Sequence, residues 1–98
     1  MKRKNKKDKF ETLFNDEGKF IRWPAQLKYQ TMVINYLHSI LEGDKEFTEN
    51  EINQFIKSNI CFYDHVTVRK NMVGIKALIK IDDGRAYYKN NDYKRLYL

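Results

Sequence analysis

The hydrophobic patterns of this chain predict an α+β domain with three helices, a short N-terminal strand and a C-terminal β-hairpin. Three observations carry the prediction. Residues 25–42 form an amphipathic stretch at helical period, and Thr48 with Glu51 has the spacing of a helix-starting capping box. Near the C-terminus, Asp83-Gly84 lies between two short apolar runs, which is a strong hairpin signal.

The N-terminal quarter is expected to contain a helical turn and a strand. Phe10, Leu13 and Phe14 have i, i+3, i+4 spacing, which predicts a short helix over 8–14. A turn over 15–18 follows, with Gly18 able to adopt a positive φ. Residues 19–23 then indicate a short strand. The proline at position 24 is expected to end that strand, because proline suits the first turn of the next helix.

The first long helix is predicted over 25–42, and Gly43 is expected to end it. One face of this helix is polar, and the remaining positions are apolar enough to face a core. The polar stripe consists of Lys28, Thr31, Asn35, His38 and Glu42. The apolar positions are Leu27, Val33, Ile34, Tyr36, Leu37, Ile40 and Leu41.

The second helix begins at Thr48 and ends near Asn59. Phe47 and Ile52 occupy the positions of a hydrophobic staple around the capping box. A third helix is predicted from its cap, Asp64, to about residue 75. Its buried side and that of the second helix should meet in the core. The second helix contributes Ile52, Phe55 and Ile56.

The hairpin comprises the runs 78–81 and 86–88 around the turn 82–85. Strand, three helices and hairpin follow one another in the order typical of a winged helix-turn-helix domain, in which the hairpin is the wing. The predicted organisation is a basic tail over 1–9, the domain over 10–90 and a C-terminal tail over 91–98. Tyr93, Leu96 and Tyr97 are expected to pin that last segment.

The net charge of +6 is concentrated at the N-terminus. Residues 1–9 hold six basic side chains against one acidic one, a charge of +5, whereas the other 89 residues hold 13 basic and 12 acidic side chains. A tail this polar does not fold alone, and it can either grip nucleic acid phosphates or keep the protein soluble. Its cations up to position 7 are Lys2, Arg3, Lys4, Lys6 and Lys7.

Several classes of protein are disfavoured. The chain has one cysteine, Cys61, which excludes an internal disulfide and suits a reducing cytoplasm as a small buried apolar residue. No apolar run reaches the length of about 18 residues that spans a bilayer. His38, His65 and Cys61 lack metal-ligand spacing, and no nucleophile or phosphate-loop motif occurs. We therefore expect a cytoplasmic binding protein, without cofactor or metal, rather than an enzyme.

Several segments of the chain form a recognisable pattern. They are 16–19, 23–25, 47–53, 68–73 and 83–84 followed by Tyr87. Together they resemble an uncharacterised bacterial domain family that is found alone or at the C-terminus of transcriptional regulators. The family pattern departs from this chain at Gln26, at Lys70 and near Lys76. The resemblance implies a winged-helix-like fold and a link to transcription, without an established activity.

The third helix is where a winged helix usually reads DNA. Its apolar side, expected to face inward, comprises Val66, Val68, Met72, Val73 and Ile75. The opposite side carries Thr67, Lys70 and Asn71, which are chemically able to meet base edges and phosphates, or which form a solvated polar face. Phosphate contacts by the wing would come from Lys80, Arg85 and Lys89. The leading hypothesis is therefore a module that binds double-stranded DNA in transcriptional regulation.

Other charged residues are expected to be structural. Arg69 should meet a carboxylate of the second helix, and the acidic residues of 42–51 should favour the start of that helix. Because the folded part is nearly neutral and rich in tyrosine, the alternative is a protein-protein interaction or inhibitor module that reads no DNA.

Overall fold

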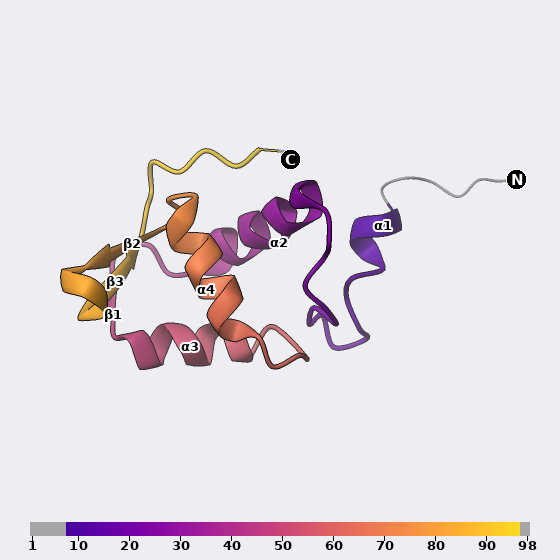
Figure 1. The fold of residues 1–98 in the computed structure, drawn as a ribbon, viewed down its shortest axis with the longest axis horizontal. Helices are drawn as coiled ribbons and strands as arrows, with labels where there is room; N and C mark the ends of the chain where they lie inside the picture. Colours follow the sequence, from indigo (N-terminus) through magenta and orange to yellow (C-terminus); the bar gives the residue numbers. More distant parts are fainter. Residues whose placement is uncertain (1–7, 97–98) are drawn as a thin grey trace, which may run out of the picture.

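The computed structural model describes residues 8–96 and has an α+β fold. Its helices are α1 (Asp8–Glu11), α2 (Leu27–Ile40), α3 (Glu49–Lys57) and α4 (His65–Gly74). Its strands are β1 (Glu46–Phe47), β2 (Leu78–Ile81) and β3 (Ala86–Lys89), with a 3₁₀ turn at Asp82–Gly84. The antiparallel sheet has the order β1-β3-β2. Figure 1 shows this sheet at one end of the group formed by α2, α3 and α4.

The three long helices and the hairpin confirm the predicted winged-helix-like layout, but the expected strand over 19–23 is wrong. Within that segment only Phe20 forms isolated bridges, to Phe14 and Ile60. The third strand of the sheet is β1, where Phe47 pairs with Tyr87. After the short α1, the observed order is thus helix, strand, helix, helix, hairpin. β1 could not be predicted from the sequence, because two residues are too few to show the alternation of polar and apolar side chains that marks a strand.

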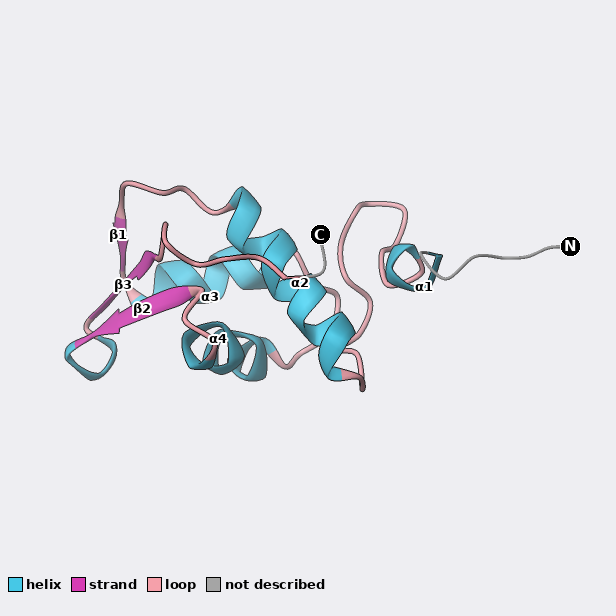
Figure 2. Ribbon diagram, turned by 90° about the horizontal axis from the view of Figure 1, so that it is seen from above, coloured by secondary structure: helices cyan, strands magenta, loops and turns pink. Residues whose placement is uncertain are grey.

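The core forms where α2, α3 and α4 meet the inner face of the sheet (Figure 2). The helices α2, α3 and α4 contribute residues at helical period, so each of the three has one buried side. The buried residues of the helices include Val33, Leu37, Ile52, Ile56, Val68 and Met72, and those of the hairpin include Leu78 and Tyr87. Among the described residues, no helix is long and apolar enough to cross a membrane.

The local helix-starting signals are confirmed. The Thr48 side chain accepts a hydrogen bond from the Glu51 N–H, and the Glu51 carboxylate accepts one from the Thr48 N–H. Asp64 caps α4 by accepting from the Thr67 N–H at 3.3 Å. The expected end of α2 is wrong, because extended backbone at Leu41 (ψ 138°) ends the helix two residues before Gly43. Leu41 is buried, so the chain turns inward there rather than at the glycine.

The expected polar stripe of α2 is only partly solvated. Asn35 and His38 are only 4% and 2% exposed, because residues 90–96 lie along this helix and cover them. Tyr93 donates a hydrogen bond to Asn35 Oδ1 at 2.6 Å, and the Leu96 carbonyl accepts one from the Asn35 amide. The predicted pinning by Tyr93 is therefore confirmed, whereas Leu96 contributes only its carbonyl and its side chain is exposed. Tyr97 lies outside the described residues. Two expected apolar positions of this helix, Leu27 and Ile40, are instead exposed.

The N-terminal segment packs through aromatic contacts. α1 is shorter than the predicted helix over 8–14, because Phe14 turns away to bridge Phe20 at a ring distance of 4.4 Å. The predicted turn is confirmed, with Gly18 at φ 79°. The expectation that Cys61 is buried is wrong, since its thiol is exposed and accepts a hydrogen bond from the Asn15 amide at 3.0 Å.

Candidate nucleic-acid interface

The orientation of α4 is set by two completely buried side chains, Val68 and Met72. The opposite face is open to solvent and includes the exposed Lys70, with the half-buried Thr67 beside it. Two members of the expected apolar side, Val66 and Ile75, are instead 37% and 36% exposed. At 100° per residue, Val66 lies about 160° from Val68, and residue 75 already follows the helix, so neither can turn into the core.

The residues of α4 that are predicted to contact DNA bases differ in how many of their polar atoms already bond within the protein. Asn71 is half-buried, and its amide nitrogen donates to the Thr67 carbonyl at 2.8 Å. One of its two amide N–H groups is thereby used, and the second N–H and the amide oxygen remain for a partner. Lys70 is exposed and makes no ion pair with a described residue, so its ammonium can meet an anion. Tyr63, just before the helix, is completely exposed.

The three predicted cations of the wing are not equivalent. Lys80 is exposed on β2 beside its cross-strand neighbour Tyr87. The Arg85 guanidinium pairs with Asp82 in the turn at 3.0 Å, which neutralises it locally. Lys89, at the other end of the hairpin, donates to the Leu41 carbonyl at 3.1 Å and so satisfies the end of α2. The predicted contacts of Lys2, Arg3, Lys4, Lys6 and Lys7 lie outside the described residues.

A pocket of about 280 Å³ separates α4 from the hairpin, and it brings Lys70 and Lys80 together. Its charged lining consists of three cations and two carboxylates, the third cation being Arg69. The two lysines come from the helix and the strand that would approach a nucleic acid together in a winged-helix arrangement. Arg85 and Lys89 do not line this pocket. The lining residues are Glu49, Arg69, Lys70, Val73, Gly74, Lys80, Asp83 and Tyr87.

Beneath this pocket, a hydrogen-bonded network joins α3, α4 and the hairpin. Tyr87 donates to Glu49 Oε1 at 2.7 Å, and Arg69 lies 3.9 Å from the other carboxylate oxygen. Arg69 also donates to Asn53 Oδ1 at 2.5 Å, and only 12% of its side chain is exposed. These contacts confirm the predicted pairing of Arg69 with a carboxylate of the second helix. Arg69 therefore supports α4 rather than facing a partner.

The same network perturbs two titrating groups. The Tyr87 hydrogen bond, followed by the charge of Arg69, lowers the pKa of the Glu49 carboxyl. Burial, followed by the hydrogen bond to Glu49, raises the pKa of the Tyr87 hydroxyl. The turn fits closely over this pair, since Gly84 has φ 107° and a Cβ there would lie 3.0 Å from Glu49 Oε1. Sequence reasoning missed the role of Glu49, because its partners are 20 and 38 residues away.

Among the described residues, no group of three His, Cys, Asp or Glu side chains could hold a metal ion.

The fold and the exposed face of α4 define a small winged-helix-like α+β domain. A family model described as uncharacterized protein conserved in bacteria (DUF2087) matches residues 19–89, so the chain belongs to that family. This membership confirms the resemblance seen in the sequence. Searches of curated proteins and of solved structures found no match.

Proposed function

We propose that this domain binds double-stranded DNA in the cytoplasm and acts in transcriptional regulation. The observation that supports the proposal best is the meeting of Lys70 from α4 with Lys80 from β2 around one pocket. In helix-turn-helix proteins the second helix of the motif lies in the major groove, and here that helix is α4. Its face away from Val68 and Met72 is open for such contact.

Some of the proposed contacts position the protein on the DNA, and the others determine which base sequence it prefers. Lys80 of the wing holds a phosphate, and the cations of residues 1–7 add sequence-independent attraction. Lys70, the Thr67 side chain and the amide oxygen of Asn71 face base edges, where lysine suits guanine and an amide oxygen accepts from adenine or cytosine amino groups. Glu49, at the acidic start of α3, also lines this pocket, but its carboxylate already accepts a hydrogen bond from Tyr87 and pairs with Arg69.

We propose binding rather than catalysis. Glu49 is the one carboxylate among the described residues whose pKa is clearly lowered, and it owes this shift to Tyr87 and Arg69, which also hold the hairpin and α4 in place. A structural role accounts for this perturbation without a reaction.

A protein partner is the second candidate, and one observation favours it. Tyr63 is 100% exposed and Val66 is 37% exposed, so the outer side of α4 presents aromatic and aliphatic surface beside its single lysine. Aromatic residues of this kind are enriched in protein interfaces. On this alternative the same helix face would bind protein and ignore DNA sequence.

One experiment distinguishes the two candidate functions. Duplexes are selected from a random library with the full chain, and their affinity is then measured by fluorescence anisotropy. Under the DNA proposal, Lys70→Ala weakens binding to a selected duplex by about tenfold and relaxes its sequence preference. Lys45→Ala is the matched control, since this exposed lysine precedes β1 at the other edge of the sheet. Binding that ignores Lys70→Ala and vanishes when residues 1–9 are deleted would support the protein-partner alternative.

A further inference from the structure

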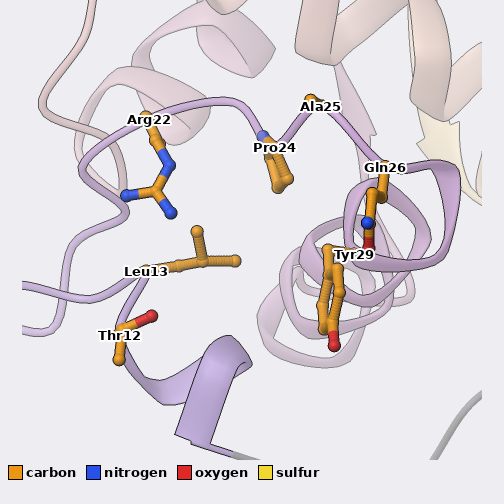
Figure 3. Close-up of a pocket in the computed structure, with 7 residues that line it drawn as sticks. All are labelled: Thr12, Leu13, Arg22, Pro24, Ala25, Gln26 and Tyr29. Carbon is orange, nitrogen blue, oxygen red and sulfur yellow. The ribbon is translucent and has the colours of Figure 1, made fainter. Parts of the chain in front are cut away.

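A second pocket lies between the N-terminal segment and the start of α2 (Figure 3), and Figure 1 shows that these segments lie away from the wing. Its volume is about 350 Å³, within the usual range for small-ligand sites. Two of its lining residues, Thr12 and Leu13, precede the range that the family model matches. The pocket therefore exists only because the N-terminal segment packs against the family domain.

The packing of that segment is specific. The Ile21 N–H donates to the Leu13 carbonyl at 2.7 Å, and Leu13 is 2% exposed. Asn15 closes the intervening turn by accepting hydrogen bonds from the Glu17 and Lys19 N–H groups. This pairing sets Leu13 beside Arg22 and makes the leucine the apolar base of the pocket (Figure 3).

Arg22 is the charged residue of the lining, which contains no carboxylate. Within residues 8–96, the Arg22 guanidinium makes no hydrogen bond or ion pair, although five N–H donors are available on it. Figure 3 shows Arg22 and Tyr29 on opposite sides, with Pro24 between them. Gln26, beside Tyr29, forms no side-chain cap to α2, so its amide can also meet a ligand.

We infer that this pocket binds a small organic anion with a flat apolar body, of the aromatic carboxylate class. The guanidinium of Arg22 pairs with the carboxylate through two parallel N–H donors, a geometry that arginine favours. The ring of the ligand packs on Leu13 and Pro24 and contacts the aromatic face or edge of Tyr29. One cation and this volume suit a single-ring monoanion better than a nucleotide, which carries several negative charges.

Benzoate is the probe that tests the site, titrated into the ¹⁵N-labelled full chain while backbone amide shifts are followed by NMR. The shifts should concentrate at Leu13, Arg22 and Gln26. Benzyl alcohol, which has the ring without the charge, and inorganic phosphate, which has charge without the ring, should each bind more weakly. Phosphate binding as well as benzoate would overturn the inferred ligand class.

The decisive variant is Arg22→Gln, because Arg22 is exposed and its loss should leave the fold intact. It should weaken benzoate binding by about fivefold, the upper end expected for a solvent-accessible charge pair. Arg85→Gln removes the same charge from the hairpin turn and should change nothing. Equal losses in the two variants, or shifts that cluster away from the pocket, would overturn the inference. Because the site is remote from Lys70, either outcome is independent of DNA binding.

Discussion

His38 is held in a single tautomer by the segment that covers it. Its Nε2–H donates to the Asn90 carbonyl at 2.8 Å, since a carbonyl can only accept. Its Nδ1 must accept from the Arg95 Nε–H at 3.1 Å, since a guanidinium can only donate. A second proton on this ring would point at the Arg95 cation. Burial is the main reason that the pKa of His38 is lowered, and the charges of Lys89 and Arg95 add to that shift.

Stability should therefore fall on mild acidification. The unfolded chain binds a proton at His38 near pH 6.5, whereas the folded chain binds it only at a lower pH. The contribution of neutral His38 is thus fully present above pH 6.5 and is lost as the pH falls through the folded pKa. Urea unfolding at pH 7.5 and 5.5 should show the decline in the wild type and much less of it in His38→Gln.

The chain's other histidine supplies the control for this experiment. His65→Gln, at the start of α4, is the matched substitution, and a decline that is lost in His38→Gln alone assigns the effect to His38. The acidic range below about pH 5 is avoided, because the lowered pKa of Glu49 makes that carboxylate lose its own stabilising effect there. An unchanged decline in His38→Gln would show that His38 does not cause it.

At the scale of elements, the relation of α3 to α4 depends on one largely buried arginine. Arg69 crosses from α4 to Asn53 and Glu49 on α3, and Glu49 continues the contact to Tyr87 on β3. The next residue along the chain, Lys70, points to solvent. Of these two adjacent basic residues, Arg69 thus supports the helix, and Lys70 can contact a partner.

Arg69→Met should lower the free energy of unfolding by about 2 kcal/mol, because it leaves Asn53 without its charged donor while retaining much of the apolar stem. Lys70→Met is the matched control and should change stability by less than about 0.5 kcal/mol. Urea denaturation monitored by circular dichroism measures both. If the two variants cost the same, the network does not hold the helices together.

For the whole molecule, the distribution of charge decides how DNA would be attracted. Residues 1–9 carry +5, while the remainder of the chain is close to neutral. Sequence-independent attraction by the proposed DNA-binding domain therefore depends mainly on the N-terminal cations. Sequence preference depends instead on individual side chains of α4 and not on the net charge of the chain.

Deleting residues 2–7 removes five cations and should reduce the slope of log affinity against log salt by about 4 to 5 if each contacts a phosphate. The preference among selected duplexes should survive the deletion, because α4 is unchanged. Anisotropy titrations at several salt concentrations measure the slope. A slope that does not change would mean that these residues do not contact DNA.

Features that depend on neighbouring residues followed from the sequence alone. The helix starts at Thr48 and Asp64 and the hairpin at Asp83-Gly84 are examples. In each of them the interacting groups lie within a few residues, so the local pattern contains both partners. The order of the helices and the hairpin could be predicted for this reason, as could the exposure of Lys70.

Only the tertiary structure decided which polar and apolar groups the rest of the chain covers. β1 becomes a strand because Phe47 meets Tyr87, and Asn35 and His38 become buried because residues 90–96 return to α2. Val66 stays exposed because Val68 and Met72 determine which side of α4 turns inward. These contacts join residues about 40 to 60 positions apart or depend on how a whole helix is docked, and no local pattern contains both partners.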